Sequence, residues 1–365
     1  MNNSKYLVQV RCITYNQAPY ITDAMNGFCL QKTNFPFVCT IIDDASTDGE
    51  QNVIKKYLED CFDLTDKTVV RNEETNDYLL TFARHKTNKN CYFAVLFLKY
   101  NHYSIKKSKS HYLKEWRESS KYIGLCEGDD YWIDPNKLQN QVDFLNEHEE
   151  YGLIYTDYNR LEQTGDKDVL YKSIFQSGKT PIILSFQDHL KLRGYIAPMS
   201  WVYRSEYWDI SKEYKGENAN DWTFIFALEL MLHTKVFYLN KVTSVYRVHW
   251  GSATHQKSVV NKMRYDVGLY SIQTYYLNKC NLHREMPECR DWFFWPNHRY
   301  IIAANDKSKL PELKSFFKRR KSVSIRARVL YTLMSFKIGF WGLKTIYGLK
   351  NKQLKKEYVR MIGNK

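Results

Sequence analysis

Residues 6–60 have the sequence YLVQVRCITYNQAPYITDAMNGFCLQKTNFPFVCTIIDDASTDGEQNVIKKYLED, which alternates twice between a strand pattern and a helix pattern. The apolar run at 6–13 predicts a buried strand, and residues 18–32 predict the helix that follows it. Residues 35–43 predict a second strand and residues 48–60 a second helix. Because strands in this order are joined by helical crossovers, the stretch predicts a parallel sheet and an α/β fold.

The same alternation returns after residue 120. Residues 121–126 predict a strand, and Asp134 and Pro135 predict the N-cap and the first position of a helix that extends to 150. The intervening residues 62–120 are polar and aromatic, and we interpret them as a long excursion from the sheet rather than a second domain. Further strands are expected at 152–158, 235–240 and 243–249, and further helices at 185–193 and 219–233.

Composition limits the class of protein. A chain of 365 residues with 44% hydrophobic and 16% aromatic content can build a large core, which excludes disorder as its main state. The eight cysteines include no CxxC pair and predict reduced, buried thiols of a cytosolic protein. No N-terminal stretch resembles a signal peptide, and no run reaches the ~18 apolar residues needed to span a bilayer. We therefore expect a chain that is neither exported nor membrane-spanning.

The positive charge is confined to one end of the chain. The net charge is +14, yet residues 307–365 alone contain 17 lysine and arginine residues against two acidic ones. We expect a catalytic domain at 1–255 and a helical, basic extension at 256–365. A nucleic-acid-binding protein is disfavoured, because the positive excess lies outside the acidic segments and no nucleic-acid-binding motif is present.

Three predicted strands end in polar residues, at 14–16, 43–48 and 127–130. In an open parallel sheet, ligands bind outside the carboxyl ends of the strands, so these residues are candidates for one site. Glu127, Asp129 and Asp130 place three carboxylates within four residues, a repulsion that a cation would offset. Mg²⁺ and Mn²⁺ bind carboxylates together with phosphate oxygens, which predicts a metal that holds a diphosphate.

Each of these segments also has a structural interpretation. Ser46 or Asp48 could cap the helix that follows, and the segment 127–130 could be a solvated turn. His249 could be a satisfied structural histidine rather than a ligand. The aromatic residues at 195–208 could contact an acceptor or belong to the core.

Four segments in this order resemble the family 2 glycosyltransferases of the GT-A fold, in particular the bacterial members used in surface polysaccharide synthesis. They are TYNQAPYI, IIDDASTDG, CEGDDYWIDPNKLQNQVDFL and VYRVHWGS, and the likeness extends over about residues 5–255. The resemblance implies a Rossmann-like, mostly parallel central sheet with helices on both faces. It also implies that the third segment is the DXD-type, metal-binding segment.

The resemblance assigns roles residue by residue. The implied donor-binding residues are Thr14, Asn16, Asp43, Asp44 and Asp129, the implied metal ligands are Asp129, Asp130 and His249, and the implied catalytic carboxylate is Asp221. Asp44 would accept a hydrogen bond from the base N3–H, which favours a uracil-like or thymine-like ring.

The chain departs from the family pattern in two places. Asn220 precedes Asp221 where the family has an acidic residue. The stretch that often supplies a base-stacking arginine is missing, and Arg84 or residues 100–104 would take its place.

The resemblance implies a metal-dependent enzyme that moves a sugar from a UDP-type nucleotide sugar to a hydroxyl of a glycan or lipid-linked acceptor, with inversion. The cofactor would be Mn²⁺ or Mg²⁺. A catalytically inactive nucleotide-sugar binder or scaffold is the alternative, which the joint presence of Asp129, Asp130 and Asp221 disfavours. A nucleotidyltransferase would need a glycine-rich, basic phosphate loop, which the segment CITYNQAPYI is not.

The basic end predicts a location for this chemistry. Residues 316–362 are expected to hold a cytoplasmic protein at the anionic inner face of the cell membrane as a peripheral protein. One continuous helix would align Arg326, Lys337 and Lys344 beside an apolar surface that contains Phe336, Phe340 and Trp341. The alternative is a helical pair that packs on the catalytic domain or forms an oligomer contact.

Overall fold

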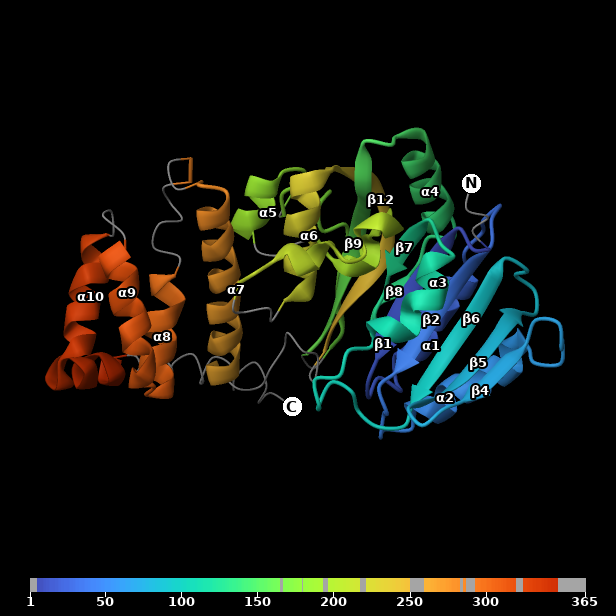
Figure 1. Cartoon of the computed structure of the whole chain (residues 1–365), viewed down its shortest axis with the longest axis horizontal. Helices are drawn as coiled ribbons and strands as arrows, with labels where there is room; N and C mark the ends of the chain where they lie inside the picture. The colour runs from blue at the N-terminus through green and yellow to red at the C-terminus, as the bar shows by residue number, and fades with distance from the viewer. Residues whose placement is uncertain are drawn as a thin grey trace.

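The computed structural model describes residues 5–164, 167–178, 180–192, 196–216, 221–249, 259–282, 285–286, 293–319 and 324–346. The molecule is elongated, with a large twisted sheet at one end and a group of helices at the other (Figure 1). Helix α7 lies between the two parts, beside α6 on one side and α8 on the other (Figure 1).

The sheet has the strand order β3-β5-β6-β2-β1-β7-β11-β9-β12-β8, with β10 paired to β9 and β4 to β5. Its centre, β6-β2-β1-β7, is parallel, as is the pair of β9 and β12. The strands are β1 Val8–Thr14, β2 Phe37–Asp43, β3 Phe62–Asp63, β4 Arg71–Glu74, β5 Tyr78–His85, β6 Cys91–Leu98, β7 Tyr122–Leu125, β8 Tyr131–Trp132, β9 Tyr151–Gln163, β10 Val169–Tyr171, β11 Val202–Arg204 and β12 Lys235–His249.

The helices surround the sheet and continue beyond it. They are α1 Ile21–Cys29, α2 Glu50–Cys61, α3 Lys114–Glu118, α4 Lys137–Glu147, α5 Phe186–Leu192, α6 Trp222–His233, α7 Val259–Lys279, α8 Phe294–Ala304, α9 Leu310–Arg319 and α10 Ile325–Ser335. The predicted α/β class, with a parallel sheet centre and a helical C-terminal extension, is therefore confirmed.

Residues 62–98 belong to the sheet, which corrects the predicted excursion over 62–120. Strand β6 pairs in parallel with the whole length of β2, from Phe37 opposite Cys91 to Asp43 opposite Phe97. The sequence of β6, CYFAVLFL, is an unbroken apolar run, and seven of its eight residues are buried. Such a run is typical of a strand covered on both faces, so this strand was open to prediction.

Two predicted element boundaries are wrong. Helix α4 begins at Lys137 with Asn136 as N-cap, whereas Asp134 Oδ1 accepts from the backbone N of Asn136 in the preceding turn. The two strands expected at 235–249 form one strand, β12, because irregularities between Leu239 and Ser244 let it follow β9 without a break.

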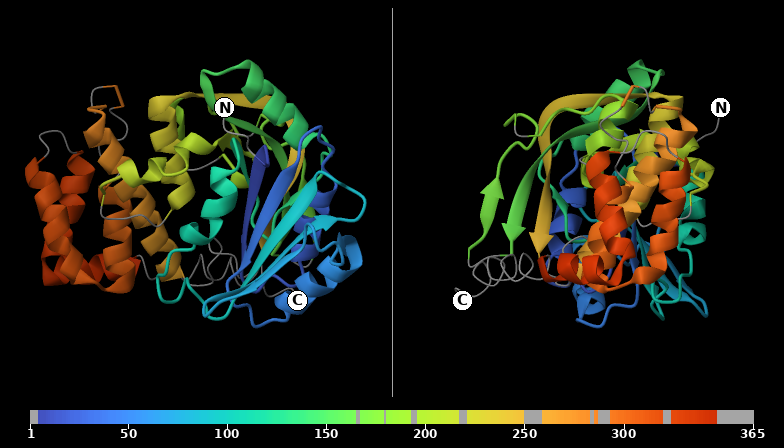
Figure 2. Two further views of the ribbon diagram at one scale, coloured as in Figure 1. Left: turned by 45° about the vertical axis from the view of Figure 1, so that its right-hand side comes forward. Right: turned by 90° about the vertical axis from the view of Figure 1, so that its left-hand side faces the viewer.

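The helical extension has two cores. Helix α7 packs on α5 and α6 through a cluster that includes Phe224, Ile272 and Tyr276. Helices α8, α9 and α10 lie side by side (Figure 2). They share a second cluster around Phe294, Leu313 and further apolar residues. None of the described helices is both long and apolar enough to cross a membrane.

The predicted continuous helix of the tail is interrupted. Helix α10 ends at Ser335, Phe336 has extended backbone angles, and residues 337–346 are helical again. Phe340 is buried in the second cluster, whereas Phe336 and Trp341 are 65% and 70% exposed. The expected grouping of these three aromatic residues on one surface is therefore wrong for Phe340.

Lys137 is fully buried at the start of α4, next to the sheet. Its Nζ donates to Gln141 Oε1 at 2.5 Å and lies 4.6 Å from the centre of the Trp132 ring. Burial lowers the pKa of Lys137 from 10.5 to about 7. Lys137 therefore binds a proton more weakly in the folded protein than in the unfolded chain.

We predict that the free energy of unfolding rises with pH between about 7 and 10.5, because in this window the unfolded Lys137 binds a proton and the folded one does not. Lys137→Met removes this contribution and raises stability most near neutral pH. Chemical denaturation across the window measures it, with the exposed Lys56→Met as control. An equal pH dependence in wild type and Lys137→Met contradicts the prediction.

Candidate active site

The three polar strand ends meet at one edge of the sheet. Thr14 and Asp43 are opposite each other at the ends of β1 and β2. In the turn that follows β7, Glu127 Oε2 accepts a hydrogen bond from the backbone N of Ile13 at 3.2 Å. A side chain on Gly128 would overlap Thr14 Oγ1, so the turn after β7 lies directly against the end of β1. The sequence-predicted convergence of these segments is thus present.

A buried carboxylate that the sequence interpretation missed organises the first two strand ends. Glu50, at the start of α2, contacts Thr14 Oγ1 and accepts from Gln17 N at 2.9 Å and Ser46 Oγ at 2.8 Å. Its pKa is raised by burial. The position of Glu50 in the first turn after DASTDG is the signal that could have found it.

Asn16 and Asp43 hold the loop between β2 and α2. Asn16, which adopts a left-handed conformation with φ 54°, accepts from Thr47 N at 2.8 Å and donates its own N–H to Ser46 Oγ at 2.9 Å. Asp43 Oδ1 accepts from Ser46 N and from Gln51 Nε2 at 2.6 Å, and burial raises its pKa. The buried Asp43 Oδ2 has no hydrogen-bond partner among the described residues.

Asp44 is buried and bonded to a loop that follows β6. Its Oδ1 accepts from His102 N at 2.8 Å, and its Oδ2 accepts from Tyr103 N at 3.1 Å and from Lys109 Nζ at 2.8 Å. The Lys109 side chain is itself only 13% exposed. Both carboxylate oxygens are therefore engaged, and a buried ion pair joins the loop to the end of β2.

A second acidic residue anchors the other side of this loop. Asp77 accepts from Lys107 Nζ at 2.7 Å, from Tyr112 Oη at 2.8 Å and from Tyr100 Oη at 2.5 Å. These bonds, led by that from Lys107, lower the pKa of Asp77. Tyr103, Ser104 and residues 106–109 line an open hollow of about 570 Å³, and Tyr103 is 82% exposed.

The acidic turn after β7 is closed by β12. Asp129 Oδ2 lies 3.0 Å from His249 Nε2, and Asp130 Oδ1 accepts from Arg247 N at 2.8 Å. The Arg247 side chain donates to the Asp129 carbonyl oxygen at 2.8 Å and to Asp23 Oδ2 at 2.6 Å. Burial, and then the charge of Asp129, raise the pKa of Asp130 well above its usual range.

Asp129 and His249 fit a divalent cation. A carboxylate oxygen and an imidazole nitrogen already lie together, and both are ligand types that Mn²⁺ accepts. After burial, the negative charge of Asp129 contributes to the raised pKa of Asp130, and a cation would oppose that contribution. Asp130 Oδ1 is bonded to the Arg247 backbone, and the described residues do not bring an Asp130 oxygen together with these two atoms as a third ligand.

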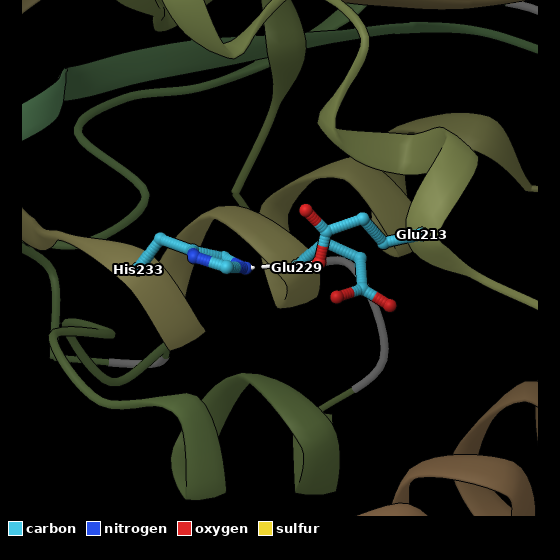
Figure 3. Close-up of side chains that lie close together, drawn as sticks. All are labelled: Glu213, Glu229 and His233. Carbon is cyan, nitrogen blue, oxygen red and sulfur yellow. Dashed lines mark hydrogen bonds and ion pairs between the residues drawn. The ribbon is translucent and has the colours of Figure 1, made fainter.

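A different group, Glu213, Glu229 and His233, brings its candidate ligand atoms within 4.8 Å of one another (Figure 3). Glu229 is buried and accepts from Tyr276 Oη at 2.8 Å and from Lys279 Nζ at 2.8 Å. The Lys279 ammonium already supplies the positive charge that a cation would bring, so we interpret this group as a structural ion-pair network.

Asp221 is far from the acidic turn in the sequence. It is the N-cap of α6. Its Oδ1 accepts from Phe224 N at 2.9 Å and from Thr223 Oγ1 at 2.8 Å. Its Oδ2 accepts from Tyr265 Oη on α7 at 2.6 Å. Both oxygens thus have structural partners, and Asp221 ties α6 to α7.

No protein-family model matches the chain. Uncharacterized proteins of Mycobacterium bovis and Mycobacterium tuberculosis are each 28% identical to it over 251 residues, which cover 66% of this chain and 60% of theirs. The chain thus spans about 60% of the length of these curated relatives.

Two solved structures are similar in three dimensions. S. aureus TarS 1-349 in complex with UDP-GlcNAc has a TM-score of 0.52 at 15% identity, and the match covers 95% of this chain and 92% of that one. The mannosyltransferase PcManGT from Pyrobaculum calidifontis, in complex with GDP-Man and Mn²⁺, has a TM-score of 0.45 at 12% identity, covering 94% and 85%. The fold is that of the GT-A glycosyltransferases, as the likeness to TarS shows.

We predict that Lys109→Met releases residues 101–109 from the end of β2, because a buried Asp44 without its counter-charge is strongly disfavoured. Hydrogen exchange of these residues should accelerate, whereas the exposed neighbour Lys106→Met should leave it unchanged. Slow exchange retained in Lys109→Met would show that the backbone bonds to Asp44 suffice.

Proposed function

We propose that the protein is an inverting glycosyltransferase of the family 2 type, which moves a sugar from a UDP-type nucleotide sugar to a hydroxyl group. The observation that carries the proposal is that Asp44 and the Asp129–His249 pair follow the carboxyl ends of β2 and β7, the two parallel strands that flank β1 in a GT-A sheet. In open α/β sheets this edge is where ligands bind. The complex of TarS with UDP-GlcNAc supports a nucleotide-sugar donor.

The nucleoside end of the donor would lie near Thr14, Asn16, Asp43 and Asp44. Asp44 accepts three hydrogen bonds, which leaves one acceptor site on Oδ1 for a base N3–H. A bound donor could also draw Lys109 away from Oδ2. Released Lys109 would then lie beside the donor as a free cation, suited to a phosphate oxygen. The exposed ring of Tyr103 offers the base a stacking partner that the missing arginine of the family would otherwise supply.

The diphosphate end would lie near Asp129, Asp130 and His249, and these three would hold Mn²⁺ or Mg²⁺. Such an ion stabilises, as a Lewis acid, the negative charge that develops on the leaving diphosphate. Arg247 positions this turn, since its side chain holds the Asp129 carbonyl and its backbone N–H holds the Asp130 carboxylate.

Asp221 would remove the proton from the acceptor hydroxyl. Its Oδ2 would accept from the acceptor hydroxyl, beside or in place of the bond from Tyr265, while Oδ1 continues to cap α6. Glu217, the next candidate for this role, lies outside the described residues. The engagement of both Asp221 oxygens is the one observation that favours the alternative, an inactive nucleotide-sugar binder.

The acceptor would be a glycan or a lipid-linked glycan in surface polysaccharide synthesis. We propose a cytoplasmic protein that is peripheral at the inner face of the cell membrane. The support is the strongly basic C-terminal segment, which has 17 basic and two acidic residues from 307 onward.

We predict that a panel of nucleotide sugars, incubated with Mn²⁺, contains one donor from which the protein releases nucleoside diphosphate. Asp129→Asn should lose metal-dependent binding of that donor in calorimetry, because a neutral amide is a poor ligand for a hard cation. Asp143→Asn, an exposed carboxylate on α4, is the matched control. Binding that is equal with and without metal in both variants would reject the proposed metal site.

We predict that Asp221→Asn keeps donor binding and loses transfer by ~10²–10⁴-fold, as expected for loss of a general base. Asparagine is as good an N-cap as aspartate, so α6 should remain intact. Tyr265→Phe is the control that removes the partner of Oδ2 but keeps the carboxylate. Transfer at the parent rate in Asp221→Asn would place the base elsewhere.

A further inference from the structure

Helix α10 carries two apolar faces, of which one is covered. Ala327 and Met334 are buried in the cluster shared with α8 and α9. Ile325, Val329 and Leu333 are 80%, 53% and 41% exposed. At ~100° per residue these three fall within ~80° of one another, opposite the buried pair. The exposed stripe is thus a second apolar face, not the edge of the first.

The helical residues 337–346 repeat this arrangement. Phe340 and Leu343 are buried in the same cluster, whereas Ile338 and Trp341 are 86% and 70% exposed. Together with Phe336, 65% exposed at the break between the two helices, the exposed residues form what we call the tail surface. It consists of Ile325, Val329, Leu333, Phe336, Ile338 and Trp341.

Basic side chains flank the tail surface. On α10, Arg326 and Arg328 are exposed and lie on either side of the apolar stripe at ~100° per residue. Lys337 and Lys344 are exposed within ~60° of Trp341 on the next helix. No acidic residue occurs in the sequence from 313 to 356, so these charges have no acidic neighbour in the segment.

We propose that the tail surface docks on an anionic lipid bilayer, with its apolar side chains at the acyl boundary and its basic side chains at the lipid phosphates. Apolar residues bordered by lysine and arginine are the pattern of interfacial helices. Trp341 and Phe336 are the anchors, because aromatic side chains favour the interfacial region.

A second copy of the chain fits this surface less well. An isologous dimer would place the same patch on both sides of the interface, and Arg326, Arg328, Lys337 and Lys344 would face their own copies without acidic partners. The bilayer supplies the missing negative charge. Helix α10 also lies at the end of the molecule away from the sheet, where a flat surface could reach it (Figure 1).

This inference rests on the proposed peripheral location and names the surface that would produce it, but it does not depend on the proposed sugar transfer. Binding to lipid can be measured without donor or acceptor. A failure of lipid binding would therefore say nothing about the donor site, and a failure of donor binding would say nothing about the tail surface. If both hold, the catalytic edge works beside a membrane, where lipid-linked acceptors reside.

Co-sedimentation of the full chain with vesicles tests the proposal. We expect binding to phosphatidylcholine vesicles that contain phosphatidylglycerol, and little binding to phosphatidylcholine alone. Replacing Lys337 and Lys344 by Gln should lower the partition coefficient about fivefold per residue. Phe336→Ser with Trp341→Ser should lower it about tenfold or more. The matched controls are Lys56→Gln with Lys114→Gln and, on β10, Leu170→Ser with Tyr171→Ser, all exposed residues.

Quenching by brominated lipid gives an independent measurement. Tryptophan emission of bound wild type should be quenched, and Trp341→Phe should remove that quenching while it keeps the binding. Equal anionic-vesicle binding by wild type and the Phe336/Trp341 variant would overturn the proposal. So would concentration-dependent dimerisation in solution that this variant abolishes, since a second copy would then cover the tail surface.

Discussion

Burial of carboxylates at the carboxyl ends of β1, β2 and β7 is the constraint on which the rest of the site depends. Asp44, Glu50 and Asp130 are at most 5% exposed, and a buried carboxylate is tolerated only when hydrogen bonds or cations satisfy it. Each obtains partners from a distant segment: Asp44 from the loop after β6, Glu50 from the turn after β1, and Asp130 from β12. The bonds that these three carboxylates accept bring the loops of the site together.

The same constraint supports the charged ligand that we propose for this site. Lys109 offsets Asp44, and Arg247 binds Asp23 and the Asp129 carbonyl, so neither arginine nor lysine fully neutralises the acidic turn. Burial, and after it the charge of Asp129, raises the pKa of Asp130. A site with a basic loop on one side and excess negative charge on the other suits a diphosphate together with a metal ion.

The sequence predicted the parts of the fold whose signal is local. The alternation over 6–60 and the polar ends at Thr14, Asp43 and Glu127 gave the parallel centre and its edge. The partner of Asp44, Lys109, could not be predicted, because 65 residues separate them and a basic run is usually solvated. Strand β6 could have been predicted from its own eight residues, which are almost all apolar, but the polar residues on either side led us to interpret the region as an excursion.

In the tail, too, local features could be predicted from the sequence, whereas features that depend on tertiary packing could not. Its composition predicted helices with exposed apolar and basic residues, yet the break at Phe336 arises from packing. A side chain on Gly339 would overlap the backbone of Leu333, so the two helical segments meet at that glycine. Glycine there is a close-packing residue and not only a weakness of the helix.

The most direct test of the central claim is an anomalous difference map at the manganese edge, from crystals grown with UDP and Mn²⁺. The account predicts a peak in contact with the Asp129 carboxylate and the His249 imidazole, beside the diphosphate. A peak at Glu213, Glu229 and His233 instead, or UDP bound away from the carboxyl ends of β1 and β2, would contradict it.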